Sequence, residues 1–130
     1  MHLTPTVIIY STEEVFSCSV FLNIVPGVPF YRSGAPEGDS ITAVVYFSGC
    51  ATGYASLRMS KEIADVVTRD FLFGEDFEIT TEVIQDTARE LTNILAGRVK
   101  SYIDPPGGNL HLSLPELNQG HNFLPASLPD

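Results

Sequence analysis

The strongest hydrophobic period in the chain lies between Thr80 and Tyr102. Apolar side chains return there every three or four residues, which is the spacing of one face of an α-helix. Thr80 or Thr81 can cap the start of this helix, because a threonine hydroxyl accepts a hydrogen bond from a free N–H group of the first turn. The pattern predicts a long amphipathic helix over residues 81–102, whose apolar stripe is Ile84, Ala88, Leu91 and Leu95, joined by Thr87 and Ile94.

Two further helices are predicted from their end signals. The run Ser11-Thr-Glu-Glu14 has the form of a capping box, with the serine as N-cap and the second glutamate at the third helical position. A helix is expected from there to about Ile24, where a Pro-Gly pair ends it. Ser60 is expected to cap a helix over residues 61–73, and Gly74 to end it.

Three segments have the character of strands. Residues 41–47 are apolar and β-branched, which favours a buried strand, and the alternation over 54–59 indicates its hairpin partner. In residues 110–114 leucines alternate with polar side chains, as in a half-buried strand. The Gly- and Pro-rich segment 34–39 is predicted to be a loop, and residues 116–130 an irregular tail.

The predicted order is helix, two strands, two helices and a strand. Such an order favours an α+β fold in which the two long helices, 11–24 and 81–102, pack on one face of a mostly antiparallel sheet. A chain of 130 residues is most simply one domain, 1–130.

Composition narrows the class of partner. With 16 acidic and 7 basic residues the formal charge is -9, so the chain repels nucleic acid and favours a partner with basic patches. Solubility alone is an equally simple reason for this charge. No run of apolar residues is long enough for a membrane span, the amino terminus lacks a signal peptide, and Cys18 and Cys50 fit no disulfide or metal pattern. A cytoplasmic protein is expected.

One polar face carries the candidate chemistry. Helical spacing places a row of polar residues opposite the apolar stripe, namely Glu82, Asp86, Glu90, Asn93, Gly97 and Lys100. A solvated helix has the same appearance, and for most of this row that is the simpler interpretation. Asn93 and Gly97 are poor helix-interior residues, however, and they make more sense if a partner approaches this face closely. A carboxylate beside a carboxamide can hold a cation and a water molecule, which points to hydrolysis on a docked partner. The three histidines, His2, His111 and His121, show no metal-ligand spacing, so no metal site is predicted.

In combination, several motifs resemble the CheX-like family of chemotaxis phosphatases, which is related to CheC. The resemblance covers about residues 11–121, and its signature is the Glu-x-x-Asn sequence of Glu90 and Asn93. The matching pieces are, in chain order, Phe47-Ser-Gly49 with Gly53 and Leu57, the helix around Ala64, Phe73-Gly74-Glu75, Asp86-x-x-x-Glu90-Leu-x-Asn93-Ile-x-x-Gly97, and Leu112-Ser-Leu-Pro115.

This resemblance implies a phosphatase that hydrolyses the aspartyl phosphate of a CheY-type response regulator. Asn93 is then expected to orient the attacking water, and Glu90 to pair with a lysine of the regulator. Asp86 and Gly97 are expected to contact the partner. The Mg²⁺ would belong to the phosphorylated regulator, so the chain is expected to need no cofactor of its own.

Two departures from the family pattern matter. The amino-terminal helix carries no second Glu-x-x-Asn, since Glu13 is followed by Phe16 and Glu14 by Ser17, and a single site is CheX-like rather than CheC-like. The chain also ends before the last two strands of the family, so an open sheet edge and a homodimer are expected. Two alternatives stay open: a non-catalytic module that sequesters or bridges receiver domains, and a stand-alone structural domain.

Overall fold

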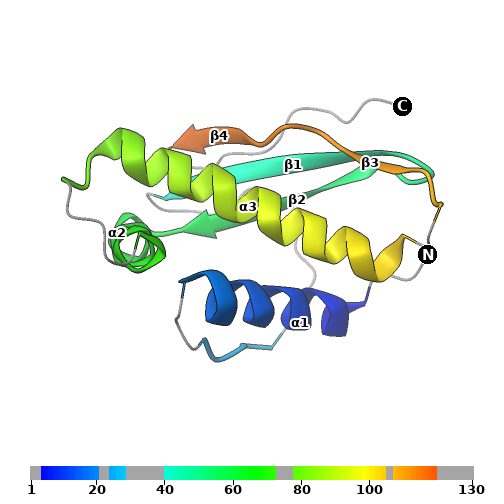
Figure 1. The fold of residues 1–130 in the computed structure, drawn as a ribbon, viewed down its shortest axis with the longest axis horizontal. Helices are drawn as coiled ribbons and strands as arrows, with labels where there is room; N and C mark the ends of the chain where they lie inside the picture. The colour runs from blue at the N-terminus through cyan, green and yellow to red at the C-terminus, as the bar shows by residue number, and fades with distance from the viewer. Residues whose placement is uncertain (1–3, 21–23, 29–39, 73–77, 105–106, 120–130) are drawn as a thin grey trace.

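The computed structural model describes residues 4–20, 24–28, 40–72, 78–104 and 107–119. Within these residues the fold is α+β, as the sequence predicts (Figure 1). Its elements are the helices α1 (Pro5–Val15), η1 (Phe16–Val20), α2 (Lys61–Phe71) and α3 (Thr81–Ile103), and the strands β1 (Ile41–Gly49), β2 (Gly53–Met59), β3 (Leu110–Leu112) and β4 (Glu116–Gln119).

Helix α3 confirms the strongest prediction. The hydroxyl of Thr80 accepts a hydrogen bond from the Val83 amide at 3.2 Å, so Thr80 is the N-cap. Two threonines are buried on the inner face of this helix, where each hydroxyl donates to the carbonyl one turn earlier. The buried face consists of Thr87, Ala88, Leu91, Thr92, Leu95, Ala96, Val99 and Ile103. Helix α2 also begins as predicted, with the Ser60 hydroxyl accepting from the Ile63 amide at 3.2 Å.

The prediction for the first helix is wrong at its start. Helix α1 begins at Pro5, and its N-cap, Thr4, lies seven residues before the predicted cap at Ser11. Proline is favoured at a first helical position because its fixed φ suits a helix and its missing N–H is not needed there. Ser11 is fully buried in the middle of the helix, in an inward row with Val7 and Val15 at four-residue spacing. A helix that started at Ser11 would leave Val7 out of the core.

The sheet is built around β1. Strand β2 pairs with β1 along seven residues in an antiparallel hairpin, from Phe47 opposite Gly53 to Ile41 opposite Met59. The other side of β1 is covered by β3 near its end and by β4 near its start, both antiparallel. The predicted antiparallel character therefore holds for every described pairing.

Strand β4 corrects the prediction of an irregular tail. Residues 116–119 pair with 41–44 of β1, while 120–130 lie outside the described residues. The change from β3 to β4 is a bulge, because three residues, 113–115, face only two on β1. Ser113 spans the bulge: its amide donates to the Tyr46 carbonyl and its hydroxyl accepts from the Tyr46 amide, each at 2.9 Å.

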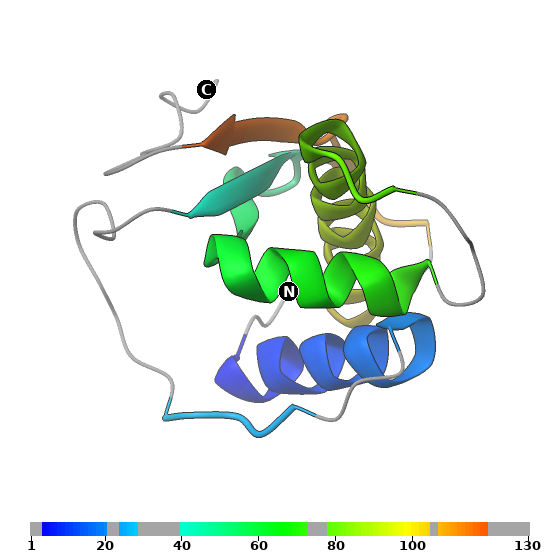
Figure 2. The same cartoon turned by 90° about the vertical axis from the view of Figure 1, so that its left-hand side faces the viewer.

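The helices lie on one face of the sheet (Figures 1 and 2). Helix α3 crosses β1 and β2, with α2 beside its N-terminal half and α1 beside its C-terminal half. The core between the layers consists of two clusters. The first is formed by Val15, Phe16, Val20, Ile41, Ala43, Met59, Ala64, Val67, Ala88, Leu91 and Leu95, and the second by Val45, Phe47, Ala96, Val99, Ile103 and Leu110. Helix α3 contributes to both clusters, so the layer that holds the candidate residues is anchored along its length.

The predicted loop 34–39 and the predicted helix end at Gly74 lie outside the described residues. No described helix is long and apolar enough to cross a membrane.

Candidate functional site

The predicted site residues form one row along α3. Asp86, Glu90 and Asn93 are exposed and Gly97 is half-buried. Their spacing of four, three and four residues keeps them on one narrow strip of a helix, opposite the face that packs on the sheet. Because an α-helix rises about 1.5 Å per residue, the row is about 16 Å long. We call these four residues the α3 row.

Glu90 and Asn93 are available to a partner. Both side chains are exposed, and no hydrogen bond or ion pair joins either of them to another described residue. A carboxamide without an internal partner keeps two donors and one acceptor for a water molecule or a ligand. A free carboxylate attracts a cation and accepts its N–H groups. The two groups lie one helical turn apart, so a single docked molecule can contact both.

Asp86 is more occupied than Glu90. The guanidinium of Arg89, one turn further on, makes an ion pair and a hydrogen bond with the Asp86 carboxylate. The aspartate side chain is nevertheless 62% exposed. Such exposed pairs contribute little to stability, so Asp86 can also accept a partner's basic group.

Among the described residues, none requires a glycine at position 97 for its packing. A Cβ atom built on Gly97 meets no other atom within 4 Å, and its φ lies in the ordinary helical range. Glycine in a helix costs up to about 1 kcal/mol relative to alanine, and nothing inside the described chain offsets that cost.

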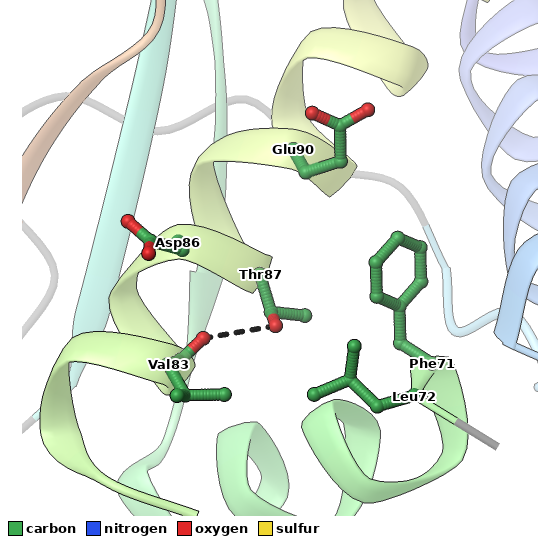
Figure 3. A pocket seen from close by; sticks show the side chains of 6 residues that line it. All are labelled: Phe71, Leu72, Val83, Asp86, Thr87 and Glu90. Atoms are coloured by element: carbon green, nitrogen blue, oxygen red, sulfur yellow. Dashed lines mark hydrogen bonds between the residues drawn. The ribbon is translucent and has the colours of Figure 1, made fainter. Parts of the chain in front are cut away.

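A groove lies beside the row, between the end of α2 and the first turns of α3. Its volume is about 320 Å³, and it is lined by Phe71, Leu72, Val83, Asp86, Thr87 and Glu90 (Figure 3). Leu72 and Val83 point toward one another across it, while Asp86 and Glu90 come from the same helix as Val83 and their carboxylates point away from the gap between Leu72 and Val83. The hydroxyl of Thr87 donates to the Val83 carbonyl at 2.9 Å, so its hydrogen is not available to a ligand in the groove.

The apolar wall of this groove was not predicted as part of a site. Phe71 and Leu72 lie in the predicted helix 61–73 and Val83 in the predicted helix 81–102, and none of the three has a sequence signal of a site. The groove exists because the end of α2 meets α3, and a contact between two elements cannot be inferred from the periodicity of either.

Metal ligands are not gathered in the part of the chain that the structure describes. No group of three or more His, Cys, Asp or Glu side chains lies close enough there to hold an ion. His111 bonds to the side chain of Asn109 at 2.8 Å, and Cys18 and Cys50 are free and exposed. Of the other histidines, His2 and His121 lie outside the described residues.

The fold resembles those of solved chemotaxis proteins. The chemotaxis protein CheX from Desulfovibrio desulfuricans superimposes with a TM-score of 0.78 at 23% identity, over 95% of this chain and 84% of that one. The protein of the same name from Vibrio vulnificus gives 0.71 at 18% identity, over 92% and 76%. The CheX of a CheX–CheY–BeF3–Mg²⁺ complex from Borrelia burgdorferi gives 0.59 at 15% identity, over 86% and 73%.

These structures share the fold at identities too low to carry more. No curated protein matches the sequence. The model of the family "Chemotaxis phosphatase CheX", however, matches residues 41–128, which is well over half of the chain and includes the whole α3 row. The chain therefore belongs to the CheX family of chemotaxis phosphatases.

Proposed function

We propose that this chain hydrolyses the aspartyl phosphate of a CheY-type response regulator. The observation that supports this most is the exposed pair Glu90 and Asn93, which has no partner among the described residues and lies on the best-anchored helix of a CheX-family chain. A related structure, from Borrelia burgdorferi, is a complex of CheX with CheY, BeF3 and Mg²⁺, which supports a receiver domain as the partner here.

Asn93 is proposed to hold the attacking water. Its carbonyl oxygen accepts one hydrogen bond from the water, and its amide group donates another to the water or to a phosphoryl oxygen. The amide does not titrate, so it orients the water without removing its proton. Phosphoryl transfer needs little more than an aligned nucleophile and neutralised charge, because its transition state is loose.

The reaction is a simple hydrolysis. The water oxygen forms a bond to phosphorus while the bond between phosphorus and the aspartyl oxygen breaks. The aspartate leaves as a carboxylate with the electron pair, and the protons of the water pass to the released phosphate and to solvent. Mg²⁺ and the phosphorylated aspartate both belong to the regulator in this proposal, so the chain itself contributes only the amide and the docking surface.

Glu90 is proposed to fix the docking geometry. Its carboxylate would pair with a lysine of the regulator near the phosphorylated aspartate. An ion pair at an interface fixes orientation and register, and it lengthens the lifetime of the complex when it becomes desolvated. Because Glu90 lies one turn before Asn93, this pair would set where the amide falls relative to the phosphorus.

The test is phosphate release from several phosphorylated receiver domains mixed with the chain. Release above the spontaneous rate with at least one receiver supports the proposal. Binding without release would instead favour a module that sequesters or bridges receivers through the same row. Neither binding nor release with any receiver would favour a structural domain.

Self-association stays a prediction. Among the described strands, β2 pairs on one side only, which leaves a seven-residue edge available. Light scattering at micromolar concentration should give the mass of two chains. A monomeric mass would contradict the homodimer.

A further inference from the structure

The groove between α2 and α3 shares two residues, Asp86 and Glu90, with the α3 row. Glu90 links the groove to the proposed chemistry, because it lines the groove and lies one helical turn from Asn93. Val83 lies ten residues before Asn93, which is about 15 Å along the helix axis. A standard protein interface covers about 800 Å² on each partner, far more than two side chains. A receiver domain centred on Asn93 would therefore extend over the groove.

The two apolar side chains that face each other across the groove, Leu72 and Val83, are not part of the described hydrophobic core. Both side chains are only partly buried. Phe71, in contrast, both lines the groove and packs against the first cluster. Two adjacent apolar side chains that face each other across an open groove gain further burial only from a ligand or a partner.

The α3 side of the groove also carries two acidic residues. Asp86 and Glu90 both line it, and both carboxylates are exposed. The whole chain has a formal charge of -9, so a partner carrying positive charge is also favoured at long range. An apolar gap with acidic side chains beside it fits an apolar side chain that is followed or preceded by a lysine or arginine.

We propose that this groove is a subsite that determines which regulator binds. This proposal rests on the proposed function. An apolar side chain of the receiver domain enters between Leu72 and Val83, and a neighbouring basic residue pairs with Asp86. This basic residue is separate from the lysine assigned to Glu90. The subsite selects among receivers by their surface outside the phosphorylation site and contributes nothing to the reaction itself.

Two substitutions test the subsite without disturbing the core. Val83→Thr keeps the shape of the side chain and makes one side of the gap polar, and Asp86→Asn removes a negative charge beside it. The control is Val66→Ser, because Val66 is a 48% exposed aliphatic residue of α2 that does not line the groove. Each variant is mixed with the cognate receiver activated by beryllofluoride to measure Kd, and with the phosphorylated receiver to measure kcat.

Val83→Thr and Asp86→Asn are each expected to raise Kd about tenfold, while kcat at saturating receiver stays within about twofold of the wild type. Val66→Ser should change neither. If both groove variants bind as the wild type does while Asn93→Ala has lost activity, the subsite is wrong and the proposed function stands. If Asn93→Ala keeps full activity, the proposed function fails, and the Kd values still decide whether the groove binds the receiver.

Discussion

The phenol hydroxyl of Tyr102 donates a hydrogen bond to Glu14 Oε1, and the two residues are 88 positions apart in the sequence. The other oxygen of the same carboxylate, Glu14 Oε2, receives Arg98 Nε at 3.3 Å. Two side chains from the last turns of α3 thus converge on one carboxylate of α1. This cluster fixes the end of α3 that lies beyond Gly97, and it uses the glutamate that the sequence pattern had assigned to a capping box.

The link should weaken at alkaline pH. The hydrogen bond to Glu14 is the main cause that raises the pKa of Tyr102 above its ordinary 10.0, with partial desolvation and the charge of Glu14 adding to it. A raised pKa in the folded state means that the neutral phenol stabilises the fold below about pH 10, and that this contribution is lost as the pH rises through the folded pKa.

Tyr102→Phe should therefore be slightly less stable than the wild type at neutral pH. As the pH rises above 10, its free energy of unfolding should fall less than that of the wild type. Ultraviolet titration of the phenolates should show one tyrosine that titrates late in the wild type and is missing in the variant. If the free energy of unfolding by urea falls equally steeply with alkaline pH in the two proteins, the link is contradicted.

Gly97→Ala should separate stability from function. Alanine fits without a clash and is the better helix former, so the free energy of unfolding should rise by up to about 1 kcal/mol. Affinity for the activated receiver should fall, because the new methyl group stands on the proposed docking surface. Denaturant unfolding and a binding titration measure the two effects. If the variant is more stable and binds the receiver as tightly as the wild type, Gly97 is not part of the interface.

Gly49 should tolerate no side chain. It ends β1 with φ of 98°, and a Cβ atom there would lie 1.9 Å from the Asn109 carbonyl oxygen. That carbonyl accepts the Cys50 amide at 2.9 Å, so it is not free to move. The left-handed backbone alone costs an L-residue about 1–2 kcal/mol, and the clash adds to it, so Gly49→Ala should unfold at clearly lower urea concentration. Gly53→Ala is the matched control, since a Cβ there meets nothing within 4 Å and the midpoint should barely move.

The elements that local sequence defines were predicted well. Thr80 and Ser60 cap their helices because each needs only its own hydroxyl and an amide three residues on. The hairpin of β1 and β2 followed from the apolar run over residues 41–47 and the alternation over residues 54–59. Each of these signals lies within a few residues of the structure that it predicts.

The errors come from contacts between distant residues. Ser11 looks like a cap, but the helix starts at Pro5, with Thr4 as its cap, and this places Val7 in the core. Strand β4 is short and carries polar residues, and it exists because β1 offers an unpaired edge once the bulge at Ser113 has shifted the register. The row of Glu90 and Asn93 could be predicted because it lies on one helix. The groove beside it could not, because it forms only where the end of α2 meets α3.

The central claim is that the Asn93 amide positions the water. The most direct measurement is the rate of phosphate release from a phosphorylated cognate receiver under single-turnover conditions, with Asn93→Ala beside the wild type. The control is Gln85→Ala, which removes a carboxamide from α3 outside the row.

Asn93→Ala should lower the rate by about 10² to 10⁴, the usual scale for one positioned catalytic group, while Kd for the activated receiver changes little. Its fold should be retained, because Asn93 is exposed and has no partner among the described residues. Gln85→Ala should release phosphate at the wild-type rate. Release by Asn93→Ala at the wild-type rate would contradict the account.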